Sequence, residues 1–258
     1  MVLVERQRRI IDELLVRETA TVEELSALFN VSAVTIRSDL TQLSNLGHVV
    51  RTHGGARIAT ERVRQEYSFA TRKRTNAGAK KQIGELAVQL IEPGDSILLD
   101  SSSTAVAVAQ AMQRARISFD INVFAIGIWT ALELLGNPNI NLVLSGGYVR
   151  NTTGSFTGSI TYEFLDKFSF NKVFLGAWGI HVKNGLTDSH MLEVELKQHI
   201  LKRAQEVVAI VDGSKFGKVG LAAFAKIDQI DKVVTDKTAP LEQLRQFTSE
   251  GVDVLVAE

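Results

Sequence analysis

Apolar residues recur at intervals of three and four positions in three short segments near the start of the chain, a spacing typical of one buried helix face. The three stripes are Ile10, Ile11, Leu14 and Leu15; Val22, Leu25, Leu28 and Phe29; and Ile36, Leu40, Leu43 and Leu46. Thr21 and Ser32 stand where a hydroxyl can cap the second and third helices, and Gly47 stands where the third helix can end. The pattern predicts three short helices with helix-turn-helix spacing.

The outer face of the predicted third helix carries small or cationic side chains. At about 100° per residue its apolar stripe faces inward, Val34, Ser38 and Thr41 face outward, and Thr35 and Arg37 lie on the flanks. Thr35 can contact a phosphate or a thymine methyl group, and Arg37 can contact a phosphate or a guanine edge. One interpretation is a helix that reads the major groove of DNA. The other is a three-helix bundle with a polar solvent face.

A short hairpin is predicted directly after these helices. Residues 49–51 form its first strand, residues 53–55 its tight tip and residues 56–58 its return strand. Gly54 and Gly55 permit positive φ and a close approach to a duplex backbone, while Arg51 and Arg57 bring positive charge beside it. The hairpin would be the wing of a winged helix.

The charge distribution points the same way. The 258 residues include 29 basic and 29 acidic side chains, so the net charge is zero. Residues 1–75 hold 12 basic and 9 acidic residues, which gives +3, and residues 76–258 hold the other 17 and 20, which gives −3. A basic module on an acidic body suggests a nucleic-acid ligand, and a solvated linker is the alternative explanation for the basic residues between positions 47 and 74.

The run SAVTIRSDL from Ser32 to Leu40, followed by RTHGGA at 51–56, resembles the DeoR family of bacterial repressors. The resemblance implies that the third helix reads double-stranded operator DNA and that the wing supports it. The implied DNA-binding residues are Ser32, Val34, Thr35, Arg37, Ser38, Thr41, Arg51, His53, Gly54 and Gly55. Ser38 stands where the family usually has a larger basic or amide residue, which weakens or removes one contact.

From Ala77 onward, segments with helical apolar spacing alternate with short apolar runs. The helical segments lie near 83–90, 106–112, 191–203 and 240–250, and the strand-like runs lie near 96–99, 123–125, 140–144, 173–175, 207–211, 233–234 and 252–256. This alternation predicts an α/β domain with a mainly parallel sheet, behind a small α+β winged helix-turn-helix domain. We expect a DNA-binding domain at 1–58, a basic linker at 59–76 and an effector-sensing and oligomerisation domain at 77–258.

Three groups of polar residues follow predicted strands, where open α/β sheets bind their ligands. The run from Asp100 to Thr104 precedes a helix starting near Ala105, and its hydroxyls and free N–H groups suit a phosphate, although an ordinary cap needs only one hydroxyl. Gly146, Gly147 and Arg150 form a second loop that could hold a ligand or be a surface turn.

The third group surrounds a predicted helix. Gly185 to Thr187 precede this helix, which carries Glu193, Glu195 and Lys197, and the strand ending at Asp212 leads to Lys215. Glu193 and Lys197 are four residues apart, and a surface ion pair is the simpler explanation for them if they stand alone.

Together, and in this order, the three groups resemble the effector domain of the DeoR family. The resemblance implies a fold like that of sugar-phosphate isomerases, glucosamine-phosphate deaminases and coenzyme A transferases, and a phosphorylated sugar bound without turnover. The implied effector-binding residues are Asp100, Ser101, Ser102, Ser103, Thr104, Gly146, Gly147, Arg150, Thr187, Glu193, Glu195, Lys197, Asp212 and Lys215. Asn171 and Trp178 depart from the family pattern, so the preferred effector is expected to be unusual.

Composition narrows the remaining choices. The chain has no cysteine, which excludes disulfides, thiolate nucleophiles and cysteine-based metal sites. No apolar run reaches the ~18 residues of a membrane helix, and the first twenty residues lack a signal-peptide core, so we expect a cytoplasmic protein with no membrane partner. We predict no cofactor, no metal and no catalysis, but a homo-oligomeric repressor, dimer or tetramer, of a carbohydrate-utilisation operon, released by a phosphorylated sugar. The alternatives are a sugar-phosphate isomerase or deaminase with an accessory DNA-binding module, and a winged-helix protein-interaction module.

Overall fold

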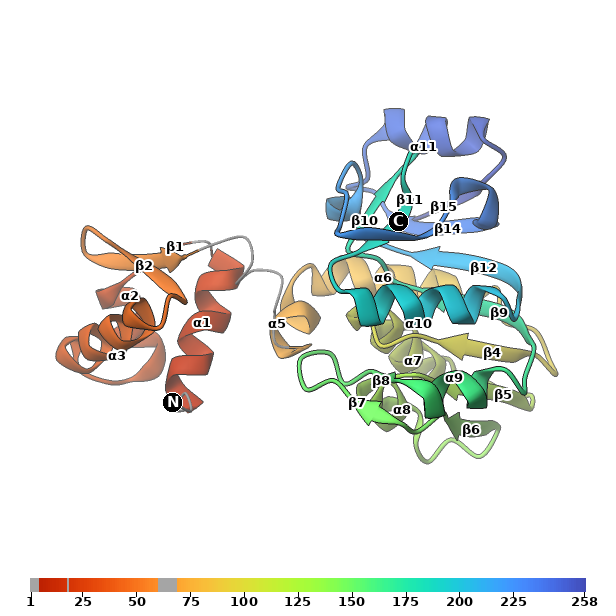
Figure 1. The fold of residues 1–258 in the computed structure, drawn as a ribbon, viewed down its shortest axis with the longest axis horizontal. Coiled ribbons are helices and arrows are strands. Elements are labelled where there is room, and N and C mark those ends of the chain that lie inside the picture. The colour runs from red at the N-terminus through yellow and green to blue at the C-terminus, as the bar shows by residue number, and fades with distance from the viewer. Residues whose placement is uncertain (1–4, 18, 60–68) are drawn as a thin grey trace. The chain divides into compact units, whose positions relative to one another are not determined.

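The computed structural model describes residues 5–17, 19–59 and 69–258, and the chain divides into two compact units, Met1–Thr75 and Asn76–Glu258. Figure 1 shows the elements of each unit in chain order.

The N-terminal unit contains the three predicted helices and the predicted hairpin. Its elements are α1 (Glu5–Arg17), β1 (Thr19–Thr21), α2 (Val22–Phe29), α3 (Ala33–Asn45), β2 (Val49–Thr52), β3 (Gly55–Ile58) and α5 (Phe69–Arg74). The hairpin β2–β3 is extended by β1, which was not predicted and pairs antiparallel with β3. Most of the predicted apolar stripe residues form one core with Ala20, Val49 and Ile58, whereas Leu28 and Leu46 are exposed.

The helix boundaries follow the predicted caps. Thr21 and Glu24 form a capping box, with Thr21 Oγ1 accepting from Glu24 N at 3.2 Å and Glu24 Oε2 accepting from Thr21 N at 2.7 Å. Ser32 Oγ accepts from Thr35 N at 3.1 Å and begins α3. Gly47, with φ 74°, lies just beyond the end of that helix, in a conformation that favours glycine.

The predicted basic linker at 59–76 is only partly described. Residues 60–68, with Glu61, Arg62 and Arg64, lie outside the described residues. In the later part, residues 69–74 form α5, and Arg74 Nη2 lies 2.6 Å from Glu13 Oε1 on α1.

The C-terminal unit is the predicted α/β domain. Its helices are α6 (Ala77–Val88), α7 (Ser103–Ala115), α8 (Ile128–Leu134), α9 (Ser159–Leu165), α10 (Met191–Leu201) and α11 (Leu241–Ser249), with short 3-10 turns η1 (Gly213–Lys215) and η2 (Ile227–Gln229). Seven parallel strands stand in the order β15 (Asp253–Ala257), β14 (Lys232–Asp236), β12 (Ala204–Ile210), β9 (Phe170–Leu175), β4 (Ser96–Leu99), β5 (Ile121–Ala125) and β6 (Ile140–Leu144). The predicted parallel sheet is thereby confirmed.

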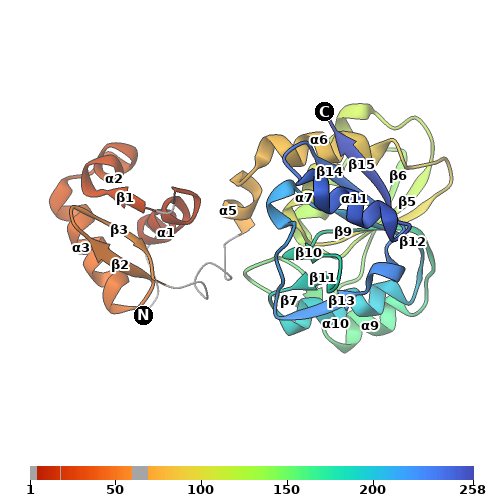
Figure 2. The same cartoon turned by 90° about the horizontal axis from the view of Figure 1, so that it is seen from above.

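Helices cover both faces of this sheet, as Figure 2 shows from above. Alternate strand residues therefore enter different cores: Ile97 and Leu99 of β4 pack with α6, α7 and α8, and Leu98 packs with α9, α10 and α11. This two-sided burial explains why the predicted strands are continuous apolar runs.

Two smaller sheets lie beside the main one. β10 (Gly179–His181), β11 (Gly185–Asp188) and β13 (Ala222–Ala225) form an antiparallel sheet, and β7 (Tyr148–Val149) pairs with β8 (Phe156–Thr157). Neither sheet was predicted, because strands this short leave little periodicity. Within residues 5–17, 19–59 and 69–258, no helix is long and apolar enough to cross a membrane.

Candidate functional site

The exposed face of α3 carries the residues that the sequence assigned to DNA. Val34 is 72% exposed, and Arg37, Ser38 and Thr41 are exposed as well. Thr35 is half-buried, and its Oγ1 lies 2.9 Å from Ser32 Oγ, so its hydroxyl already takes part in the cap. Within the described part of the chain, the guanidinium of Arg37 has no hydrogen-bond or ion-pair partner. The face therefore presents an available cation among small side chains.

The wing lies against this face. Arg51 on β2 donates from Nη1 to the carbonyl oxygen of Arg37 at 3.2 Å and approaches Thr41 Oγ1 at 3.4 Å. His53 and Gly54 are exposed at the tip, where Gly54 has a φ of 83°. The hairpin and α3 thus place two arginines on adjoining elements.

The expectation for Gly55 needs correction. Gly55 is buried and does not have positive φ; a Cβ there would lie 2.1 Å from the carbonyl oxygen of Ala20 on β1. Its lack of a side chain is required by the β1–β3 pairing, which the sequence analysis did not foresee. The expected positive φ at Gly55 is therefore wrong, and Gly54 alone has it at the tip.

An ion pair between a half-exposed arginine and a buried aspartate joins α3 to α1. Arg6 Nε lies 2.6 Å from Asp39 Oδ2, and Gln7 Nε2 donates to Asp39 Oδ1 at 3.3 Å. The hydrogen bond to Asp39 raises the pKa of Arg6 above its ordinary value. Asp39 belongs to the run that carried the family resemblance, and its role in this structure is to orient the helix.

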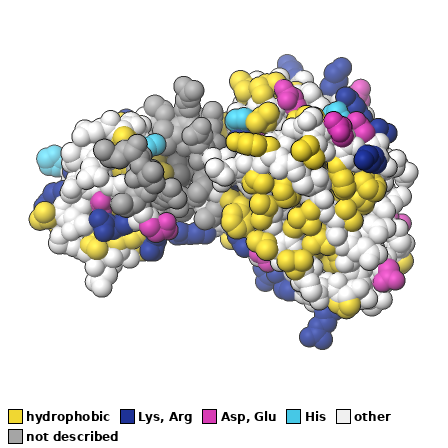
Figure 3. Space-filling view, turned by 60° about the horizontal axis from the view of Figure 1, so that its bottom comes forward, with side chains coloured by type: hydrophobic (Ala, Val, Ile, Leu, Met, Phe, Trp, Pro, Cys, Tyr) yellow, Lys and Arg dark blue, Asp and Glu magenta, His cyan; other side chains and the backbone are white. Residues whose placement is uncertain are grey.

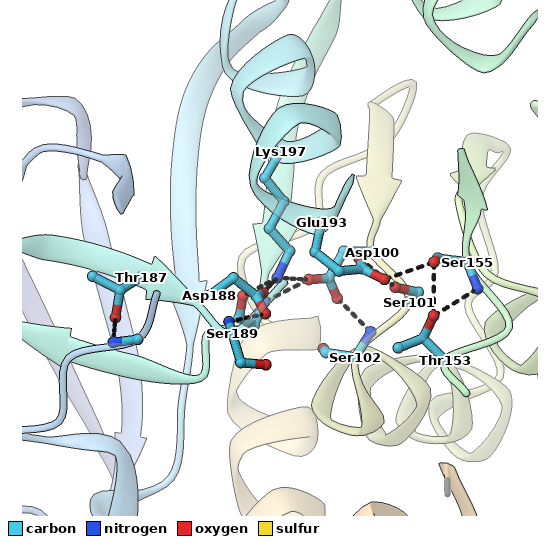
Figure 4. A network of polar contacts seen from close by, with 12 residues as sticks. Asp100, Ser101, Ser102, Thr153, Ser155, Thr187, Asp188, Ser189, Glu193 and Lys197 are labelled. Carbon is cyan, nitrogen blue, oxygen red and sulfur yellow. Dashed lines mark hydrogen bonds and ion pairs between the residues drawn. The ribbon is translucent and has the colours of Figure 1, made fainter. Parts of the chain in front are cut away.

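In the C-terminal unit, the carboxyl ends of neighbouring strands bring the predicted polar residues to one edge of the sheet. Asp100 follows β4, Gly176 follows β9, and Asp212 follows β12 soon after its end. Figure 4 shows the network that forms at this edge with side chains from α10 and β11. The loops after β4 and β12, which the sequence expectation named, thus lie at the same edge as the loop after β9, which it did not name.

Asp100 organises the loop after β4. Its Oδ1 accepts from Ser102 N at 2.9 Å, its Oδ2 accepts from Gly176 N at 2.8 Å, and its carbonyl oxygen accepts from Thr130 Oγ1 at 3.0 Å. Ser102 in turn caps α7, accepting from Ala105 N at 3.0 Å. The helix starts at Ser103, slightly earlier than predicted, so Ser103 and Thr104 occupy its first turn and are buried.

Lys197 is held from three sides. Its Nζ lies 2.8 Å from Asp188 Oδ2 and 3.4 Å from Asp100 Oδ2, and it donates to the carbonyl oxygen of Gly176 at 2.7 Å. Burial alone would lower the pKa of Lys197, but the charges of Asp188, Asp100 and Glu193 outweigh it and raise the pKa above its ordinary value. Lys197 is therefore a buried cation with its positive charge already matched.

Glu193 points to the other side of the network. Its Oε1 lies 2.6 Å from Arg150 Nη1 and accepts from Ser155 Oγ at 2.7 Å. Burial would raise the pKa of Glu193, yet the positive charges of Lys197 and Arg150 and the Ser155 hydroxyl lower it below its ordinary value. Glu193 and Lys197 are thus not the isolated surface pair considered from the sequence, since both are buried and each has nearer partners.

Asp212 forms a second polar group near the carboxyl end of β12. Asn76 Nδ2 donates to Asp212 Oδ1 at 2.9 Å, and the Ser214 hydroxyl donates to the same oxygen. Burial would raise the pKa of Asp212, but the charge of Lys215, the Ser214 hydrogen bond and the charge of Lys80 lower it. Lys215 is half-buried on η1.

Several other predicted effector residues have structural duties. Thr187 Oγ1 donates to the carbonyl oxygen of Gly179 at 3.1 Å and accepts from Gly220 N at 2.8 Å. A Cβ on Gly147 would lie 2.2 Å from Thr161 Oγ1, so that glycine accommodates a side chain of its own unit. Gly146 has a φ of 65° at the loop after β6.

Two further residues lie away from the network. Glu195 is exposed, because on α10 it faces away from Glu193 and Lys197. Asn171 Oδ1 accepts from Ser96 N at the amino ends of β9 and β4, the opposite edge of the sheet. Trp178, by contrast, is half-buried just after β9 and donates from its backbone N to the carbonyl oxygen of Thr187 at 3.0 Å.

Sequence reasoning missed four residues that complete the network. Asp188 and Ser155 supply direct contacts, and Gly127 and Gly176 let the 100–102 loop approach, since a Cβ on either would lie within 3 Å of Ser101 or Ser102. Both glycines come soon after predicted strands, a signal that was available. Within the described residues, no cluster of three or more His, Asp or Glu could hold a metal ion.

Comparisons with known proteins agree with this two-part arrangement. The family "DeoR-like helix-turn-helix domain" matches residues 6–62, and the family "DeoR C terminal sensor domain" matches residues 75–237. The HTH-type transcriptional regulator GolR of Listeria innocua is 35% identical over 98% of each chain, and the glycerol-3-phosphate regulon repressor of Escherichia coli is 27% identical over 97% of each chain. Ribose 5-phosphate isomerase A from Methanocaldococcus jannaschii matches over 55% of each chain at 20% identity, with a TM-score of 0.42.

Proposed function

The chain belongs to the DeoR family of transcriptional regulators, and on that basis we propose that it is a repressor whose N-terminal unit binds an operator and whose C-terminal unit binds a phosphorylated sugar that releases it. The proposal assigns DNA binding to residues 1–58 and effector sensing and assembly to residues 77–258. We further propose that the protein is a homo-oligomer and that it does not catalyse a reaction.

The observation that carries the DNA-binding part is the exposed Arg37 on α3 with Arg51 of the wing beside it. In this proposal the first half of α3 enters the major groove, where Arg37 reads a guanine or grips a phosphate and Val34 contacts a thymine methyl group. Arg51 is close enough to the same face to neutralise a phosphate on the flanking backbone.

The effector part rests on the first turn of α7. The leading N–H groups of a helix have no partner within the helix and carry its positive dipole end, which suits a phosphate. Ser103 and Thr104 place hydroxyls in this turn, and the preceding Ser101 lies 3.5 Å from Glu193. The phosphate of the effector would bind here, with the sugar hydroxyls directed toward the carboxylates of the network.

The existing ion pairs of Lys197 and Arg150 indicate which of the two cations can bind the effector phosphate. Lys197 already faces two carboxylates, whereas Arg150 faces Glu193 alone among the carboxylates of the network and retains 13% side-chain exposure. Arg150 is therefore our candidate for the cation that turns from Glu193 to the effector phosphate, with Lys215 as a second. A ligand shifts the repressor only by binding one arrangement more tightly than another, and this exchange supplies such a difference.

Purified full-length protein tests both parts. Footprinting should reveal one protected sequence upstream of its target genes, and a panel of sugar phosphates screened by thermal shift should reveal a ligand that releases this DNA. At 100 times its dissociation constant such a ligand adds about 2.7 kcal/mol of stability. Ser103→Ala with Thr104→Val, which preserve side-chain volume, should abolish ligand-induced release and leave DNA binding intact; Ser249→Ala on α11 is the matched control.

Two outcomes would contradict the proposal. One is the absence of any sequence-dependent protection, which favours a protein-interaction module. The other is sustained conversion of the bound sugar phosphate that is lost in Glu193→Gln, which favours the isomerase or deaminase reading.

A further inference from the structure

One face of the C-terminal unit exposes large apolar side chains. On α8 and at its end, Trp129, Leu132 and Leu135 recur at intervals of three residues and are 42%, 55% and 63% exposed. Tyr148 on β7 is 73% exposed, and Leu144 at the end of β6 is 41% exposed. We call these five residues the α8 patch. Figure 3 shows apolar side chains gathered over this side of the unit.

The elements of the patch adjoin one another in the fold. Ile128 N donates to the carbonyl oxygen of Gly154, which joins the start of α8 to the loop between β7 and β8. A Cβ on Gly154 would lie 2.6 Å from Trp129 Nε1, so the indole packs directly on that loop. Large exposed apolar side chains that gather in one patch, unlike those that stand singly, mark an interaction surface.

The scarcity of charged residues around the α8 patch limits the kinds of partner that can bind it. Between Arg116 and Arg150 the sequence contains no lysine or arginine and only two acidic residues, Asp120 and Glu133. Glu133 Oε1 accepts a hydrogen bond from Gln110 on α7, and Arg150 is paired with Glu193. A surface without free cations suits neither nucleic acid nor an anionic membrane, both of which select lysine and arginine. Depletion of charge is typical of the core of a protein–protein interface.

The neighbouring strand β6 has one edge that pairs with no other described strand. It stands at one end of the seven-stranded sheet and, within the described residues, pairs only with β5. Its sequence from Ile140 to Leu144 contains no charge and no proline. Monomeric proteins usually protect such an edge with charged residues, proline or a covering element. An apolar patch beside an unprotected edge is therefore a surface that another protein covers.

We propose that the α8 patch and the free edge of β6 form the surface through which two copies of this chain associate. A two-fold interface brings the same patch together with itself, so an apolar, uncharged face is complementary to its own copy without any matching charge. This assignment rests on the proposed function in one respect: a winged helix reads one half-site, and a specific operator complex is normally built from two such units.

The α8 patch lies close in the chain to Arg150, which links the association of two copies to effector binding. Tyr148 of the patch lies two residues before Arg150, and Gly154 and Ser155 join the patch to Glu193 through a single loop. An effector that draws Arg150 away from Glu193 therefore acts on the loop that underlies the contact between the two copies.

Sedimentation velocity of the full-length protein, without DNA or effector, tests the surface. Wild-type protein should be a dimer or larger at micromolar concentration. Leu132→Asp and Tyr148→Asp, made separately, should each raise the dissociation constant at least about tenfold, because each buries a carboxylate in an apolar contact. Leu241→Asp is the matched control: Leu241 is 72% exposed on α11, which packs against β15 at the other end of the sheet. Circular dichroism confirms that each variant is folded.

The natural lack of cysteine permits an independent measurement. Leu135→Cys should be joined to a second copy by a long bismaleimide at protein concentrations where the control Leu241→Cys is not. An assembly larger than a dimer supports the proposal if Leu132→Asp reduces its subunit number, and contradicts it if the number is unchanged.

Three results would overturn the proposal: a monomeric wild-type protein, an assembly that survives both aspartate substitutions, or equal weakening by Leu241→Asp. None of these measurements uses DNA, so the surface can fail while operator binding stands. Conversely, a dimer that depends on the α8 patch but protects no DNA sequence would refute the proposed function and leave the surface assigned.

Discussion

Arg150 and Glu193 lie 43 residues apart in sequence, yet their charged groups meet at 2.6 Å, with only 13% and 5% of the side chains exposed. The sequence analysis assigned both residues to the binding of an effector. In the structure the two side chains form an ion pair with each other. A ligand that binds either one must therefore replace this ion pair.

Glu193→Gln should reduce the stability of the C-terminal unit in a pH-dependent manner. The lowered pKa of Glu193 means that its ionised form stabilises the fold fully above its ordinary value of 4.5, and that this contribution is lost as the pH falls through the lower folded value. The difference in unfolding free energy between wild type and variant should therefore shrink below about pH 4.5. Urea denaturation at a series of pH values measures it. A constant difference across that range would contradict the assignment, and Glu195→Gln, exposed on the same helix, serves as control.

Lys197→Met should destabilise the C-terminal unit more than Glu193→Gln does. Removal of the ammonium group leaves the buried Asp100 and the half-buried Asp188 without their shared cation, and loss of one partner of a buried pair costs about 3–5 kcal/mol. Chemical denaturation followed by tryptophan fluorescence gives the free energy. Lys202→Met, at the exposed end of the same helix, should change it little. If Lys197→Met is as stable as Lys202→Met, the contacts of Lys197 with Asp100 and Asp188 do not stabilise the fold.

Arg37→Ala should weaken specific operator binding by about 1–3 kcal/mol and relax discrimination at one base pair, the range for loss of a base-reading arginine. Arg245→Ala removes the same charge from exposed α11 and should leave binding unchanged. Fluorescence anisotropy with operator and single-mismatch duplexes provides both affinities. Equal binding by wild type and Arg37→Ala would remove this residue from the reading surface.

Arg51→Ala should weaken binding to all DNA sequences alike. Arg51 lies on the wing, where it can reach the backbone, and a phosphate contact carries no sequence information. The slope of log affinity against log salt should fall in magnitude by about 1. Titrations of operator and unrelated DNA at several salt concentrations measure the slope, and a loss confined to the operator would mean that Arg51 reads a base instead.

The sequence by itself determined the elements whose causes are local. Thr21 and Ser32 begin α2 and α3 because a hydroxyl satisfies N–H groups only three residues away, and the tip at Gly54 forms because a hairpin turn requires positive φ. The parallel strands were predictable for a similar reason, since burial on both faces produces continuous apolar runs such as that from Ile97 to Leu99.

Only the tertiary structure decided which polar groups meet. Gly55 is buried because β1 pairs with β3, and Gly147 leaves space for the side chain of Thr161. The charge of Lys197 is neutralised by Asp188 and Asp100, which come from two other parts of the fold. None of these relationships follows from spacing along the chain, because the order of strands in the sheet sets which loops are neighbours. A buried charge must be paired, but its partner is chosen by packing across tens of residues, and that choice turned predicted ligand contacts into contacts within the protein itself.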